Sequence, residues 1–225
     1  MKIVINILII MIASIATSNA QFFVEGSVGA RFSGQSSSLD GVTKNNPSSY
    51  HFEVSPLVGY HLNEKLVLGV SAFFIRSTER FIITDPDTGD EILLERKSPG
   101  WGGSVFDRYQ LWGTKKFSLL VESSIFVNES YSSETRGSKV IKNENRSSIG
   151  INAFPLISYD LSDRFSITLS TDFMRLDLYT QTINNKDTGV KTKSPHFEFN
   201  GQSTILSSLS AIRIGIIYHF KKSDK

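Results

Sequence analysis

The chain has 225 residues, a formal net charge of +2 and no cysteine, which excludes a disulfide framework and a lipid-modified N-terminal cysteine. Its basic residues are scattered rather than clustered, so the sequence has no nucleic-acid footprint and we expect no nucleic-acid partner. After the N-terminal twenty residues, no apolar run approaches the roughly 20 residues that a spanning helix needs.

The N-terminus has the composition of a secretory signal. Lys2 is positively charged, Ile3–Ile15 is mostly apolar, and Ser18–Ala20 supplies the small residues that signal peptidase reads. We therefore predict a cleaved signal peptide over residues 1–20 and a single domain over residues 21–225. Loss of Lys2 lowers the formal charge from +2 to +1.

The mature chain is a series of segments in which apolar and polar residues alternate, the pattern of half-buried β-strands. Strands are expected at about Phe22–Phe32, Tyr50–Leu62, Lys65–Ile75, Gly102–Trp112, Phe117–Asn128, Ile149–Tyr159, Phe165–Phe173 and Ser203–Phe220. Pro56 and Pro155 interrupt two of them, and we expect β-bulges there. Asp107 interrupts a third, which indicates a bulge or a locally polar membrane edge.

The last segment shows the alternation most clearly. One face carries Arg213 and His219, which an apolar core would not readily accept. The other face is apolar and ends in aromatic residues: Ile212, Ile214, Ile216, Tyr218 and Phe220. Such a strand fits a membrane β-barrel, with lipid outside and a polar lumen inside.

This terminal set resembles the sorting signal of bacterial outer-membrane barrels, although Lys221–Lys225 follow the aromatic residue at which many members stop. The resemblance implies recognition by the barrel-assembly machinery and contact with outer-membrane lipid. At the level of topology, the mature chain resembles small barrels of the OmpX- or OmpW-like plan and the porin-family β-barrel domains of the Bacteroidetes type.

The connections between the segments alternate in length. Short turns follow the second, fourth and sixth strands. Long loops follow the first, third, fifth and seventh strands. This alternation predicts an all-β fold: an eight-stranded antiparallel up-and-down transmembrane barrel with short periplasmic turns and long extracellular loops. Two loops are expected to continue as hairpins, around Phe81–Leu94 and Tyr179–Val190. The loops Gly34–Ser49 and Glu129–Arg146 are expected to be mobile, apart from a short pairing near Val140.

Aromatic residues gather at both ends of the expected strands, as in the interfacial belts of membrane proteins. One belt lies beside the short turns: Tyr60, Trp112, Phe117, Tyr159, Phe165, Tyr218 and Phe220. The other lies near the long loops: Phe32, Tyr50, Phe52, Phe74, Phe173 and Tyr179.

Alternation also places ionisable residues in the lumen: Glu25, Arg31, Glu53, Arg108, Glu122, Asp172 and Arg213. The interior of an eight-stranded barrel is small enough for side chains to fill, and unpaired charges there cost several kcal/mol. We therefore expect a salt-bridge network that plugs the lumen. The alternative is a narrow gated path.

The sequence gives weaker support for metal binding or catalysis. The acidic tip Asp85–Glu91 could bind calcium through its carboxylates, but we favour a solvated hairpin tip. His51, Glu53 and Ser55 share one strand face and are the residue types of a hydrolase, yet polar lumen residues are expected anyway. We predict no enzyme activity, no cofactor and no metal site.

Three functions remain open. The first is an envelope-structural or surface-interaction platform that meets an unknown extracellular partner through long loops. The second is a narrow channel or lateral conduit for small or apolar molecules. The third is a periplasmic lipocalin-like barrel, in which the apolar strand faces would point inward to bind a ligand.

Overall fold

The computed structural model describes residues 22–39, 42–84, 91–136, 139–171, 174–200 and 211–220, where the regular structure is β-strand. The strands are β1 (Phe22–Leu39), β2 (Val42–His61), β3 (Leu66–Thr84), β4 (Glu91–Gly113), β5 (Phe117–Arg136), β6 (Lys139–Asp160), β7 (Phe165–Thr171), β8 (Arg175–Asn185), β9 (Lys191–Asn200) and β10 (Ala211–His219). In these ranges no helix is long and apolar enough to cross a membrane.

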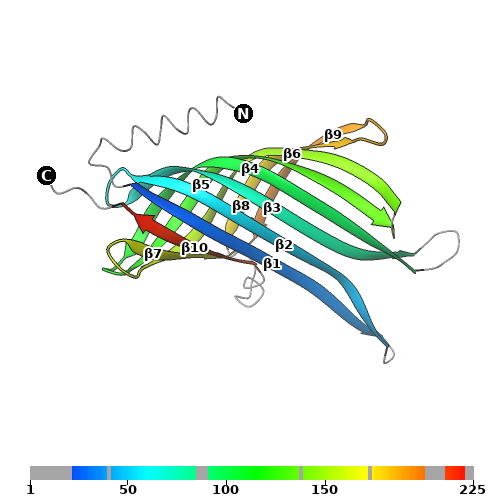
Figure 1. The fold of residues 1–225 in the computed structure, drawn as a ribbon, viewed down its shortest axis with the longest axis horizontal. Helices are drawn as coiled ribbons and strands as arrows, with labels where there is room; N and C mark the ends of the chain where they lie inside the picture. Colours follow the sequence, from blue (N-terminus) through cyan, green and yellow to red (C-terminus); the bar gives the residue numbers. More distant parts are fainter. Residues whose placement is uncertain are drawn as a thin grey trace.

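Eight strands close into an antiparallel ring, in the order β1, β2, β3, β4, β5, β6, β7, β10 (Figure 1). The ring is completed by β1 and β10, whose pairing runs from Phe23 opposite His219 to Arg31 opposite Ala211. In a closed ring every strand has a hydrogen-bonding neighbour on each side, as a sheet that crosses lipid requires. The predicted eight-stranded up-and-down barrel is confirmed.

Three short turns lie at one end of the barrel, where β1 also begins and β10 ends (Figure 1). The same hydrogen-bond pattern closes all three. A side-chain oxygen of Asn63, Thr114 or Ser162 accepts from the backbone N–H groups two and three residues later. Such turns bind their own backbone locally, which explains why they need so few residues.

The inward and outward faces follow the predicted alternation. On the outside, Val28, Ile125 and Ile216 are 50%, 62% and 59% exposed, whereas Glu25 and Arg108 on the inside are 5% and 4% exposed. Apolar residues outside and charges inside is the arrangement of a membrane barrel. It is the reverse of a lipocalin-like barrel, so that alternative is wrong.

Where their side chains are described, the aromatic residues of both belts lie on the outer surface, with the exception of Tyr179. Phe173 lies outside the described residues. Beside the short turns, Tyr218 contacts Phe165 and Phe220, with both ring-centroid distances at 5.2 Å. At the other level, Phe52 and Phe74 are 51% and 59% exposed. Tyr179 was assigned to this belt but lines the lumen cavity instead.

The expected mobile loops at Gly34–Ser49 and Glu129–Arg146 are mostly strand, which corrects the prediction. The ladder between β1 and β2 continues to Leu39 opposite Val42, and that between β5 and β6 to Arg136 opposite Lys139. The polar composition of these segments suggested loops. Backbone pairing satisfies the same peptide groups whichever side chains the strand carries.

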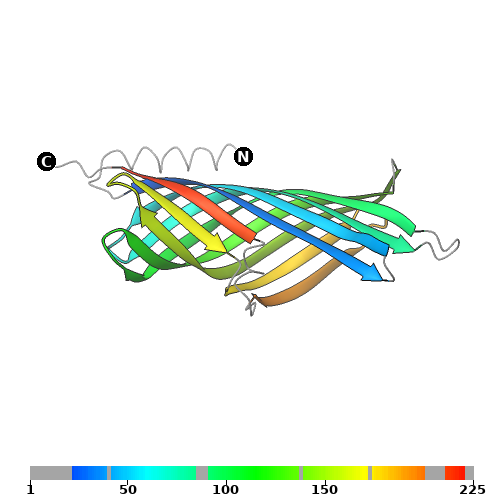
Figure 2. The same cartoon turned by 90° about the horizontal axis from the view of Figure 1, so that it is seen from below.

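Two strands, β7 and β8, lie beside β6, where the sequence predicts a single seventh strand. Residues Leu156–Asp160 of β6 pair with β7, whereas its residues Glu144–Ala153 pair with β8. The described residue between β7 and β8 is Met174, which has a positive φ of 56°. β9 then pairs with β8 as the second strand of the predicted hairpin, whose tip contains Gly189 at φ 70° (Figure 2). Residues 203–210 of the predicted last strand lie outside the described residues.

The expected bulges are not at the prolines. Pairing is in continuous register at Pro56 opposite Gly26 and at Pro155 opposite Val121. Pro155 lies where the other neighbour of β6 changes from β8 to β7. A register shift does occur in β4, but at Gln110–Trp112 rather than at Asp107.

Candidate functional site

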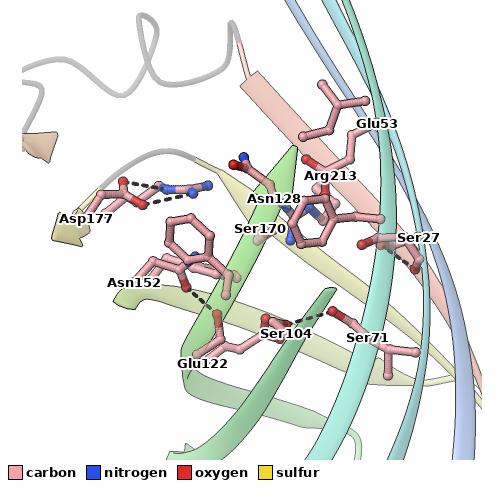
Figure 3. Close-up of a pocket in the computed structure, with 18 of the residues that line it drawn as sticks. Ser27, Glu53, Ser71, Ser104, Glu122, Asn128, Asn152, Ser170, Asp177 and Arg213 are labelled. Atoms are coloured by element: carbon pink, nitrogen blue, oxygen red, sulfur yellow. Dashed lines mark hydrogen bonds and ion pairs between the residues drawn. The ribbon is translucent and has the colours of Figure 1, made fainter. Parts of the chain in front are cut away.

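A cavity of about 320 Å³ occupies the lumen, lined by inward side chains from all around the barrel (Figure 3). Its lining includes Glu25, Arg31, Glu53, Arg108, Glu122 and Arg213, six of the seven predicted lumen charges. The seventh, Asp172, lies outside the described residues. The predicted facing is thus correct for each charge that can be placed.

The floor of this cavity is an arginine held between two carboxylates. Arg108 donates from Nη1 to Glu25 Oε2 at 2.6 Å and from Nε to Glu122 Oε2 at 2.8 Å. Thr168 Oγ1 donates to the other oxygen of Glu25 at 2.7 Å. All three charged side chains are buried. Because β1, β4 and β5 each contribute one of them, the trio crosses the lumen.

An apolar cluster packs against the charged trio. It consists of Phe23, Leu57, Val67, Phe106 and Ile217. The Arg108 guanidinium carbon is 5.9 Å from the ring centroid of Phe23 and 5.2 Å from that of Phe106. Of the cluster, Leu57 alone lines the cavity. The floor therefore combines the ion-paired trio with apolar side chains, four of which do not line the cavity.

Glycines make room for the two phenylalanine rings. A Cβ added at Gly59 would collide with the ring of Phe23, and one added at Gly69 with the ring of Phe106 and the carbonyl oxygen of Val58. The rings can therefore lie against the barrel wall only because these positions have no side chain.

Higher in the cavity, further charged side chains are ion-paired. Arg213 Nη2 lies 2.9 Å from Glu53 Oε1, and Arg175 binds Asp177 through two hydrogen bonds of 2.7 and 3.0 Å (Figure 3). Both guanidinium groups lie over the ring of Phe154, at 5.5 and 5.7 Å from its centroid. Ion pairs of the lumen charges thus occur both in the floor and in the upper wall.

Three charged residues of the upper wall were missed by sequence reasoning: Arg175, Asp177 and Glu198. They belong to β8 and β9, which we had assigned to a loop and its hairpin. The alternation was present, since Leu176 and Leu178 separate Arg175, Asp177 and Tyr179, and Phe197 and Phe199 flank Glu198. It was overlooked because the polar residues Thr180–Asn185 follow it directly.

The hydrolase-like residues are arranged differently from the expectation. His51 Nδ1 lies 2.8 Å from the Oγ of Ser77, not of Ser55, and Ser55 donates to the carbonyl of Ala72. His51 Nε2 is 3.9 Å from Glu53 Oε2, which exceeds hydrogen-bond distance.

Metal binding has no support in the described part of the chain, where no group of three or more His, Asp or Glu residues could hold an ion. Asp85, Asp87 and Asp90, in the tip considered for calcium, lie outside the described residues. The terminal apolar set can be placed: Ile214, Ile216 and Phe220 are 49%, 59% and 49% exposed on the outer face.

No family model matches the chain, and no curated protein matches it. Among solved structures, a major outer membrane protein of Thermus thermophilus has a TM-score of 0.46 at 17% identity, covering 89% of this chain and 99% of that one. OprG of Pseudomonas aeruginosa has 0.46 at 13%, covering 89% and 96%. The outer membrane protein W of E. coli has 0.41 at 14%, covering 89% and 98%.

All three are outer membrane proteins. Ring closure, apolar exterior, aromatic belts and charged interior give this chain the architecture of an outer-membrane β-barrel.

Proposed function

We propose that this barrel is a surface-interaction or envelope-structural platform of the outer membrane and that its lumen does not conduct. The observation that carries the proposal is the floor, in which Arg108, Glu25 and Glu122 are ion-paired and buried beside the apolar cluster. Moving a hydrated ion through it would require separating buried charges, which costs several kcal/mol.

The external side of the platform consists of strands that continue beyond the outer belt. From Phe74 the ladder of β3 with β4 runs ten residues further, to Thr84 opposite Glu91. At a rise of about 3.3 Å per residue this is about 33 Å of paired strand. β1–β2, β5–β6 and β8–β9 also end in hairpins. A partner outside the cell would therefore meet paired strands, with fewer residues to order on binding than in mobile loops.

Catalysis is not part of the proposal, because His51 Nε2 lies 3.9 Å from the Glu53 carboxylate and His51 Nδ1 pairs with Ser77. Residues 1–20, which lie outside the described residues, are proposed to be a cleaved leader. The proposal also keeps Ile212, Ile214, Ile216, Tyr218 and Phe220 as the set that the barrel-assembly machinery recognises. The exposure of Ile214, Ile216 and Phe220 on the outer face of β10 and its end supports this role.

Planar-bilayer conductance of the refolded mature protein tests the sealed lumen. We expect the parent protein to be silent. Arg108→Ala removes the cation of the floor and is expected to produce current steps or a barrel that unfolds easily. Arg213→Ala is the matched control, since Arg213 belongs to the upper wall, and it is expected to stay silent. Discrete steps in the parent would overturn the platform proposal in favour of a narrow channel.

A further inference from the structure

The charged side chains above the floor neutralise one another. This upper part of the cavity, which we call the cup, has three arginines, Arg31, Arg175 and Arg213, and three carboxylates, Glu53, Asp177 and Glu198. Arg175 and Arg213 hold Asp177 and Glu53, and Glu198 accepts from the Tyr179 hydroxyl at 2.8 Å. The formal charge of these six is zero. An ionic ligand would have to compete with pairs that already exist.

Uncharged polar groups of the cup, in contrast, retain hydrogen-bonding capacity. Within the described residues, the side chains of Asn128, Ser148 and Gln181 line the cavity and make no hydrogen bond to one another or to a neighbour. Asn152 accepts from Ser124 through Oδ1 at 2.9 Å, which leaves its NH₂ group. Amide and hydroxyl groups both donate and accept, as the hydroxyls of a polyol do.

Aromatic rings lie beside these amides. Phe73, Phe126 and Tyr179 line the same cavity, and the Phe126 and Tyr179 ring centroids are 6.5 Å apart. The Tyr179 ring also stacks on His196, with their centroids 4.7 Å apart, and this contact restrains the ring. Apolar ring faces beside a few convergent polar groups are the usual composition of a small-molecule site.

The cup has a suitable size and is accessible. The whole lumen cavity, of which the cup is the upper part, has a volume of about 320 Å³, at the lower end of the roughly 300–1,000 Å³ range of ligand pockets. Arg31 and Glu198 face inward and are nevertheless exposed, so solvent reaches the upper cup. A glycan attached to membrane lipid would lie outside the barrel wall, whereas a free molecule can enter.

We propose that the cup binds a small, uncharged polyhydroxylated molecule, a free mono- or disaccharide. Hydroxyl groups of the ligand bond to Asn128, Gln181 and Ser148, and its C–H faces lie against the aromatic rings. The proposal deepens the platform function and rests on the sealed floor, because a closed lumen retains a ligand where a pore would release it to either side.

Isothermal titration of the refolded mature protein with glucose and sucrose tests this ligand class. The protein is kept in dodecyldimethylamine oxide micelles, because detergents with sugar head groups would compete. Gluconate and glucosamine serve as the anionic and cationic probes. The double variant Asn128→Leu/Gln181→Leu removes two amides from the cup. Asn145→Leu is the matched control, because Asn145 lies on the outward face of β6.

Saturable 1:1 binding of glucose or sucrose is expected in the parent and in Asn145→Leu. Loss of the two amides should weaken it roughly tenfold or more. Heat-modifiable gel mobility shows whether the double variant folds. If it does not, Ser148→Phe, which fills part of the cup, is a second variant that should weaken binding. Absence of saturable binding, tighter binding of gluconate or glucosamine, or equal affinity in all variants would overturn the proposal.

The bilayer experiment separates this proposal from the one on which it rests. A conducting parent protein refutes the sealed floor. A silent parent that binds no neutral saccharide leaves the platform function intact and refutes the ligand alone.

Discussion

Two arginines of this barrel lie between two glutamates, in very different surroundings. In the floor, Arg108 binds Glu25 and Glu122 at 2.6 and 2.8 Å, and the three side chains are 4%, 2% and 10% exposed. On the projecting strands, Arg96 lies 3.2 Å from Glu79 and 2.9 Å from Glu134, with exposures of 26%, 48% and 12%. Both groups pair one guanidinium with two carboxylates, but water can replace a partner only on the projecting strands.

This difference indicates what each group does for the protein. A buried ion pair is at best a modest net gain over apolar side chains, but removing one partner leaves a charge without solvation. An exposed pair exchanges its partner for water at little cost. The floor therefore determines whether the lumen is closed, whereas the projecting pairs mainly set the surface that a partner meets.

The largest expected effect is that of Arg108→Met. It leaves Glu25 and Glu122 buried without their cation and should lower the free energy of unfolding by about 3–5 kcal/mol. Arg96→Met is the matched substitution and should cost less than about 1 kcal/mol. Urea titration of the protein in lipid vesicles measures both.

The triple variant Arg108→Met/Glu25→Gln/Glu122→Gln sharpens the same comparison, because it removes the unpaired charges as well. It should recover much of the stability lost by Arg108→Met. Equal destabilisation by Arg108→Met and Arg96→Met would contradict the distinction between floor and projecting strands.

Gly69→Ala tests the apolar cluster of the floor and should have an intermediate effect. The new methyl group would collide with the ring of Phe106 and the carbonyl of Val58, and overpacking of this kind costs about 1–3 kcal/mol. Gly26→Ala is the control, since a Cβ there has no atom within 4 Å. The same titration measures the unfolding free energies of both variants. Equal values would refute the close fit of the Phe106 ring against Gly69.

The smallest expected effect is a pH dependence at the projecting end of β6. Burial raises the pKa of Glu144, but hydrogen bonds from Lys142 and Arg146 outweigh it, so the pKa lies below its ordinary value of 4.5. A carboxyl with a lowered pKa contributes stability above pH 4.5 that is lost as the pH falls through the folded value.

Amide hydrogen exchange of Lys142–Arg146 should therefore accelerate below pH 4.5 beyond the intrinsic pH dependence of exchange, and much less so in Glu144→Gln. The effect should be confined to this end of the barrel, because the strands at membrane level are held by other contacts. An identical profile in Glu144→Gln would show that another group controls the opening.

Several features of the barrel were determined by the sequence alone. Strand facing, the two belts and the inward position of the lumen charges follow from period-two alternation, because each residue of a strand points to the face opposite its neighbour. Ring size followed from eight alternating segments separated by turns and loops of alternating length. These are local properties, and a single strand such as Ala211–His219 displays them without its neighbours.

The partners of the charges were decided only by the tertiary structure. Arg108 meets Glu25 from 83 residues away, and Ser77 rather than Ser55 reaches His51, because strand register brings these residues together. Likewise, the polar stretches at Gly34–Ser49 and Glu129–Arg146 form strands since a neighbouring strand completes their backbone hydrogen bonds. Alternation specifies which way a side chain points. Which side chain it meets depends on the register of strands distant in the sequence.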